Sequence, residues 1–173
     1  ITERLRFSKD IADKVTLLVR HHLFYYNVGE VTASSVRRLL RNVGPENIDD
    51  LVRIREADRI GSGVPKAVPY KLRHFKYMVE RVSKDPISTS MLAIDGHDVM
   101  RILTVEPGPK VGLVLNSLLG EVLEDPVKNT REYLEERAVE FGKQSAEELR
   151  KYLGVKEKKI EEEEAEMRKK YYV

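Results

Sequence analysis

Apolar residues recur along the chain with the three- and four-residue spacing of helices, and no stretch shows the sustained apolar-polar alternation of a half-buried strand. The pattern predicts an all-α fold, in which a helical bundle body is followed by a smaller helical tail domain. Helices are expected over residues 8–26, 34–43, 45–60, 70–83 and 147–172, on either side of a Gly-rich turn at 107–112, and after residue 130.

Two of the expected helices combine an apolar row with basic residues. In residues 34–43 the apolar positions repeat at i, i+3, i+4 and i+7, which predicts a buried row on one side. The arginines of this helix are then expected on its other side: Arg37, Arg38 and Arg41. In residues 70–83 the predicted buried row is Leu72, Phe75, Val79 and Val82, which leaves Lys71 and Arg73 on a second basic surface. Guanidinium groups fit phosphate oxygens well, although such a face is also compatible with plain solvation or pairing with nearby acids.

The two ends of the chain are expected to differ in burial. The first helix, capped by Ser8, is predicted to bury a row that includes Ile11, Val15 and Leu18. The last helix is rich in Lys and Glu and has few apolar positions, so we expect it to be solvated.

The most marked change in composition comes near residue 85. Asp85-Pro86 and the cluster Ser88-Thr89-Ser90 interrupt the helical pattern there. We therefore expect a helical body at 27–85 and a tail domain at 86–140, with a separate first helix at 1–26 and a charged C-terminal helix at 141–173. The charge also changes sign: residues 1–83 carry 16 Lys and Arg against 10 Asp and Glu, hence +6, and the remainder carries 15 against 19, hence −4.

Composition excludes several classes of protein. The chain has 173 residues, 41% hydrophobic and 35% charged, which is typical of a globular protein with a strongly charged surface. It has no cysteine, so disulfides and thiolate zinc sites are excluded. It also contains no apolar run of about 18 residues that could span a bilayer, so a cytoplasmic location is expected. The basic first half could face a polyanion.

The turn Pro107-Gly108-Pro109-Lys110-Val111-Gly112 precedes an apolar helix. The first backbone N–H groups of a helix, with Lys110 beside them, suit an oxyanion, and Gly108 and Gly112 would let a sugar-phosphate backbone approach closely. The pattern is similar to the hairpin of helix-hairpin-helix modules. The alternative is a tight connection in which Gly108 has positive φ and Gly112 allows two helices to pack closely.

The remaining candidates for chemistry are the pairs His21-His22 and His97-Asp98, which resemble those of metal-dependent HD-type phosphohydrolases. A metal site needs three or more converging ligands, and the spacing defines no such set; Asp98 is better placed as a residue near a helix N-terminus. There is no cysteine nucleophile, no GxSxG elbow and no Walker A loop. The chain alone is therefore expected to be non-catalytic, with no metal or cofactor of its own.

Seven short motifs occur in the order found in the C-terminal body and tail of bacterial class II tRNA nucleotidyltransferases, the family that includes CCA-adding and A-adding enzymes and poly(A) polymerases. They are Leu5–Ser8, Leu18–His22, Val36–Leu39, Arg55–Arg59, Asp95–Met100, Pro107–Gly112 and Glu124–Thr130. The chain resembles this family over about residues 4–135, and residues 1–26 are similar to the last helix of its HD-like region.

The resemblance implies an enzyme that adds CCA, A alone or a poly(A) tract to RNA 3′ ends from CTP or ATP with Mg²⁺. In the family these reagents bind to a catalytic head, whose motifs this sequence lacks, so the expected role here is to hold the tRNA elbow through backbone phosphates. The expected partners are tRNA or another structured RNA, and the N-terminal catalytic part of the same enzyme. The candidate RNA contacts are Arg37, Arg38, Arg41, Lys66, Lys71, Arg73, Gly108, Lys110 and Gly112. An HD-type phosphohydrolase fragment and a helix-hairpin-helix module remain the alternatives.

Overall fold

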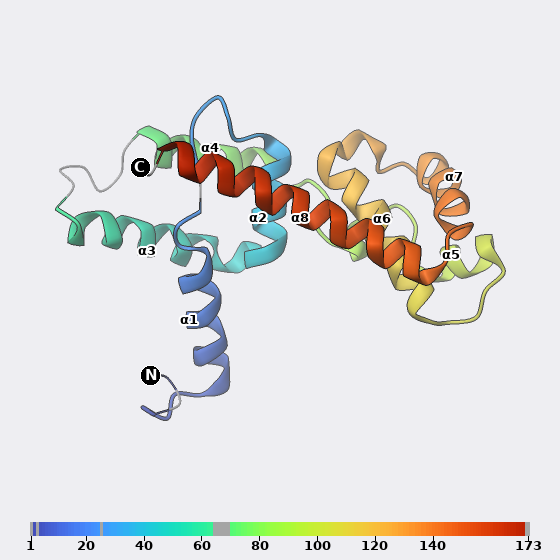
Figure 1. Ribbon diagram of the computed structural model, residues 1–173, viewed down its shortest axis with the longest axis horizontal. Helices are drawn as coiled ribbons and strands as arrows, with labels where there is room; N and C mark the ends of the chain where they lie inside the picture. Colours follow the sequence, from blue (N-terminus) through green and yellow to red (C-terminus); the bar gives the residue numbers. More distant parts are fainter. Residues whose placement is uncertain (1, 3, 25, 64–69, 172–173) are drawn as a thin grey trace. The chain divides into compact units, whose positions relative to one another are not determined.

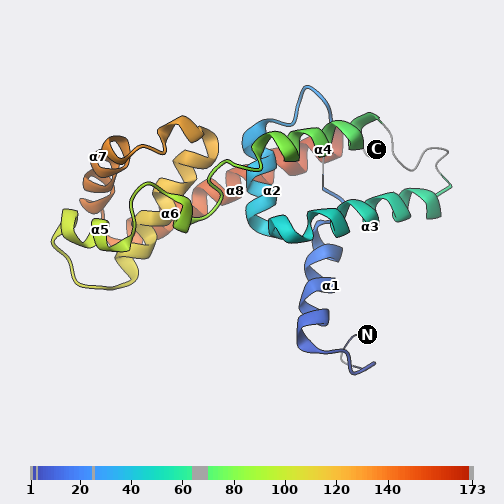
Figure 2. The same ribbon diagram turned by 180° about the vertical axis from the view of Figure 1, so that it is seen from behind.

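The computed structural model describes residues 2, 4–24, 26–63 and 70–171. In these residues it forms helices and turns and no strand, so the predicted all-α fold class is confirmed (Figure 1, Figure 2). The α-helices are α1 (Lys9–His21), α2 (Ala33–Val43), α3 (Ile48–Gly61), α4 (Tyr70–Val82), α5 (Gly96–Leu103), α6 (Pro109–Glu124), α7 (Arg131–Gly142) and α8 (Ala146–Tyr171). The chain forms two compact units, residues 1–83 and 84–173.

The first unit contains α1–α4. Its helices begin where the sequence provides capping side chains: the Ser8 hydroxyl accepts a hydrogen bond from the N–H of Ile11, and the Thr32 hydroxyl accepts one from the N–H of Ser35. Gly44, at φ +84°, ends α2, and Pro45 begins the short 3-10 turn that leads into α3. The core contains residues from α2, α3 and α4, and α2 packs against α4.

α1 differs from the expected helix in both length and burial. It ends at His21 rather than near Tyr26, because Phe24 leaves the helix and packs its buried ring 4.6 Å from that of Phe75. Of the predicted buried row only Leu18 is buried; Ile11 is 49% exposed, and Val15 is exposed too. Figures 1 and 2 show the reason: α1 meets α2 and α3 near its C-terminal end, and its first turns extend away from the rest of the unit.

The buried row of α4 also differs from the prediction at one position. Leu72, Phe75 and Val82 are buried as expected, but Met78 is the fourth buried residue and Val79 is only partly covered. Met78 lies three residues after Phe75 and four before Val82, so it fits the same helical face. Its flexible thioether side chain packs in the core of the unit.

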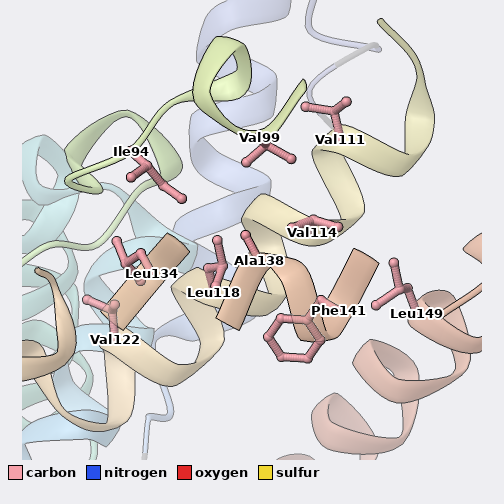
Figure 3. Close-up of a cluster of buried hydrophobic side chains, with 10 residues drawn as sticks. All are labelled: Ile94, Val99, Val111, Val114, Leu118, Val122, Leu134, Ala138, Phe141 and Leu149. Carbon is pink, nitrogen blue, oxygen red and sulfur yellow. The ribbon is translucent and has the colours of Figure 1, made fainter. Parts of the chain in front are cut away.

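The second unit contains α5–α8, with α6 in contact with each of the other three helices. Figure 3 shows the core, in which apolar residues of α6 meet those of α5, α7 and α8. The buried side chains are Ile94, Val99, Val111, Val114, Leu118, Val122, Leu134, Ala138, Phe141 and Leu149. Burial of this apolar surface is the main source of stability for the unit.

α8 is not solvated throughout, contrary to the expectation for the charged C-terminal helix. Leu149 is fully buried and Tyr152 packs against Phe141, with ring centroids 5.7 Å apart. Lys156 then donates a hydrogen bond from Nζ to the Gly120 carbonyl oxygen over 3.0 Å. The first three turns of α8 therefore belong to the folded unit. None of the helices in the described part of the chain is long and apolar enough to cross a membrane.

Candidate nucleic-acid interface

The arginines of α2 do not share one exposed face. Arg38 is partly exposed and Arg41 is exposed, but Arg37 is only 4% exposed, so its predicted placement on a basic surface is wrong. Each helical residue advances by about 100°, which places Arg37 next to the buried row that contains Val36 and Leu40. No buried side-chain nitrogen or oxygen of the described residues lacks a hydrogen-bond partner, so the buried nitrogens of Arg37 are satisfied.

α4 presents the second set of expected cations. Lys71 and Arg73 are both exposed, as the sequence predicts. Because α4 packs against α2, the structure places these residues and Arg38 and Arg41 on two adjoining helices of one unit. Lys66, the remaining candidate of this unit, lies outside the described residues.

The turn at 107–112 belongs to the other unit and has a different backbone from the one expected for a tight connection. Gly108 is the N-cap of α6 with φ −178°, which is extended backbone, so the expectation of positive φ is wrong. A Cβ on Gly112 would meet no atom within 4 Å, so this glycine does not serve close helix packing. Both glycines are exposed, and the backbone at the start of α6 is open to an approaching group.

Lys110 has a structural partner. Its Nζ donates a hydrogen bond to the carbonyl oxygen of Gly142 over 2.7 Å, so the side chain connects the first turn of α6 to the last turn of α7. A cation suits the negative end of the α7 dipole. The sequence pattern suggested that Lys110 contributes to an anion site. In the structure its ammonium group binds the C-terminus of α7 instead.

Asp95 and Asp98 build the start of α5. The Asp95 carboxylate accepts from the N–H groups of His97 and Asp98, and Asp98 accepts from the Asp95 N–H in return, forming a capping box. Asp98 also pairs with Arg101 and, over 2.5 Å, with Arg131 of α7. The hydrogen bond from Asp95, opposed by desolvation and aided by Arg131, lowers the pKa of Asp98.

The capping role explains why the pair His97-Asp98 occurs in the sequence. Among the described residues no three His, Asp or Glu side chains are grouped so that they could hold a metal ion. The phosphohydrolase interpretation therefore has no metal centre within this part of the chain.

A partly buried ion pair between α6 and α7 was not predicted from the sequence. Arg137 donates from Nε to both carboxylate oxygens of Glu121 at 3.1 and 3.0 Å, and Tyr133 donates its hydroxyl proton to the same carboxylate at 2.9 Å. Burial alone would raise the pKa of Glu121, but the hydrogen bonds from Arg137 and Tyr133 outweigh it and lower the pKa. Tyr133 and Arg137 share one face of α7, four residues apart, but the sequence gives no signal that this face meets Glu121 of α6.

Aromatic rings on the exposed side of α4 were also missed. Tyr70 is 62% exposed and Tyr77 is 57% exposed, and the partly exposed His74 lies between them. The His74 ring centroid is 6.0 Å from that of Tyr70 and 5.9 Å from that of Tyr77. We call these three residues the ring row. The spacing i, i+4, i+7 is the sequence signal that could have identified it.

Comparison with known proteins places the chain in a family. The family described as tRNA nucleotidyltransferase domain 2 matches residues 2–138. A curated protein, the CC-adding tRNA nucleotidyltransferase of Thermus thermophilus, is 34% identical over 116 residues, which cover 66% of this chain and 25% of that protein. The chain thus spans about a quarter of the length of this relative. No solved structure gives a significant match.

Proposed function

Because the chain belongs to the tRNA nucleotidyltransferase domain 2 family, we propose that it is the RNA-holding part of an enzyme that extends tRNA 3′ ends. The observation that carries this proposal is the set of cations on the adjoining helices α2 and α4, in a unit whose sequence carries a net charge of +6. Such a surface neutralises backbone phosphates, and the accompanying release of counterions drives binding.

We select the proposed RNA contacts by the exposure of their side chains. Arg38 and Arg41 on α2 and Lys71 and Arg73 on α4 present their charges at the surface and are the main candidates. Gly108 and Gly112 are secondary candidates, since the open backbone at the start of α6 can accept a phosphate oxygen. Contacts of this kind read the shape and phosphate path of an A-form RNA and carry little base specificity. The tRNA elbow is the structured surface that we propose they hold.

The nucleotidyl transfer itself is proposed for another part of the enzyme. CTP or ATP and Mg²⁺ would bind there, because the described residues of this chain offer no group of carboxylates that could hold the metal. Whether the whole enzyme adds CC, CCA, A or a poly(A) tract is determined by that catalytic part.

α1 provides the proposed contact with the catalytic part. Ile11, Val15 and Val19 fall at i, i+4 and i+8 and are all exposed, with Val19 at 57%. A row of exposed apolar residues on one helix is unusual for a surface that stays in water. Since the chain matches a quarter of its relative, the rest of the enzyme is the partner that we assign to this row.

A competition experiment tests the proposed function. The chain is bound to labelled tRNA, and unlabelled tRNA or duplex DNA of the same length is added as competitor. We expect tRNA to displace the label at a much lower concentration than DNA does. Equal competition would support the helix-hairpin-helix alternative, which the hairpin of α5 and α6 leaves open. Absence of binding to the labelled tRNA would contradict the proposal.

A further inference from the structure

The ring row of α4 has the properties of a base-stacking surface. The two tyrosine rings at its ends are largely exposed, which is uncommon for such large apolar side chains in a folded unit. Every nucleobase has a π face, so exposed aromatic rings beside cations are the usual platform for unpaired nucleotides. None of the three residues of the ring row is among the phosphate contacts proposed above.

Contacts with Tyr26 connect the ring row to the core of the unit. His74 Nδ1 and the Tyr26 hydroxyl share a hydrogen bond of 2.5 Å, and the Tyr26 ring packs edge-on against Phe75 with centroids 5.1 Å apart. Phe75 is buried in the core of the unit. The middle ring is therefore fixed to the core, and little conformational freedom remains to be lost when a ligand covers it.

Positive charge lies along the same side of the helix. Arg81 falls four residues after Tyr77, so it extends the spacing of the row to i, i+4, i+7 and i+11, and it is exposed. Arg73 is also exposed, about 60° around the helix from Tyr70. Lys76 lies about 120° from Tyr70, outside the row, and pairs with Glu56 over 3.1 Å. A strand whose bases cover the rings would thus have its phosphates near guanidinium groups. An uncharged protein segment would form no ion pairs with these cations.

We propose that the ring row binds unpaired bases of a structured RNA, with one base stacked on Tyr70 and one on Tyr77. This inference rests on the proposed RNA-holding function and adds a second mode of contact to it. Phosphate contacts alone do not distinguish a paired stem from a loop, whereas stacking requires bases that are free of pairing. The row therefore confers a preference for RNA that presents unpaired nucleotides.

The test compares two double substitutions and two RNAs. Tyr70→Phe with Tyr77→Phe keeps both rings, and Tyr70→Leu with Tyr77→Leu removes them while keeping apolar volume. Each variant is titrated with a tRNA transcript, which has unpaired loops, and with a blunt RNA duplex of similar length. Stacking contributes about 1–3 kcal/mol per base, so we expect the Leu variant to bind tRNA about tenfold or more weakly and the duplex as wild type does. The Phe variant should bind both RNAs within about twofold of wild type.

Three results would overturn the inference. The Leu variant could bind tRNA like wild type, it could lose affinity for both RNAs equally, or the Phe variant could lose as much affinity as the Leu variant.

In each case salt-dependent tRNA binding by the wild-type chain would still support the proposed function. If the wild-type chain fails to bind tRNA, the proposed function is contradicted, and the inference that rests on it is contradicted too. Circular dichroism checks that the variants are folded, and Tyr77→Leu alone should show a smaller loss with the same preference for tRNA.

Discussion

The Nζ of Lys110 donates a hydrogen bond over 2.7 Å to the carbonyl oxygen of Gly142, 32 residues further along the chain. The bond joins the start of α6 to the end of α7 and satisfies one of the carbonyl groups that a helix leaves unpaired at its C-terminus. It also changes the interpretation of the turn at 107–112. The exposed glycines remain available to an anion, while the lysine stabilises the fold.

Replacement of Lys110 by Met should therefore destabilise the second unit. The change keeps the aliphatic stem and removes the charged donor, which we expect to lower the free energy of unfolding by about 1–2 kcal/mol. Lys143→Met is the matched control, because Lys143 is exposed, and it should change stability by less than about 0.5 kcal/mol. Denaturant titration followed by circular dichroism measures both. Equal stability of the two variants would show that the Lys110 bond is unimportant.

A side chain at Gly142 would collide with Leu103. A Cβ there would clash with Cδ2 of Leu103 and lie 3.0 Å from its Cδ1, so Gly142→Ala forces the leucine to move. We expect a loss of about 1–3 kcal/mol. Gly154→Ala provides the contrast, because Gly154 lies inside α8 with no atom within 4 Å of a Cβ, and alanine should stabilise that helix by about 0.5–1 kcal/mol. Thermal unfolding should move in opposite directions for the two variants.

Acid should weaken the packing of α6 against α7. Because the pKa of Glu121 is lowered in the folded state, its stabilising effect is complete above its ordinary value of 4.5 and is lost as the pH falls through the folded pKa. The free energy of unfolding should thus decrease below about pH 4.5. Glu121→Gln should make this decrease less steep. Asp50, Asp98 and Glu148, whose pKa values are also lowered, contribute to the slope that remains. Parallel pH curves for wild type and variant would contradict the assignment.

Two substitutions on α1 should have very different effects on the chain alone. Leu18→Ala removes a buried side chain and should cost about 2–4 kcal/mol. Val19→Ser, one residue later, changes an exposed position and should cost less than about 0.5 kcal/mol, apart from a small loss of helix propensity. In the complete enzyme Val19→Ser should instead be destabilising, because the apolar row would face the catalytic part. Differential scanning calorimetry of both forms decides between these outcomes.

The sequence predicts the features that depend on neighbouring residues, such as helix caps and the spacing of apolar positions. Ser8 supplies the N-cap of α1, Pro45 leads into α3, and the i, i+3, i+4 pattern identifies the helices of both units. The errors have tertiary causes. α1 ends early because Phe24 packs against Phe75, 51 residues away, and Arg37 is buried beside the apolar row of α2.

The candidate site is only partly predictable for the same reason. The exposure of Lys71 and Arg73 follows from the phase of α4, whereas the partner of Lys110 comes from a different helix. Single-helix patterns indicate which side of a helix a residue occupies. They do not indicate which cation a distant carbonyl or carboxylate will bind.

The salt dependence of tRNA binding tests the central claim most directly. The affinity of wild type and of the double variant Arg38→Ala, Arg41→Ala is measured over a range of salt concentrations, with circular dichroism as the check on folding. We predict that the logarithm of the affinity falls linearly with the logarithm of salt concentration for wild type. In the variant the slope should flatten by about one for each phosphate that the arginines no longer neutralise. Wild-type binding that does not respond to salt, or identical slopes for the two proteins, would contradict the account.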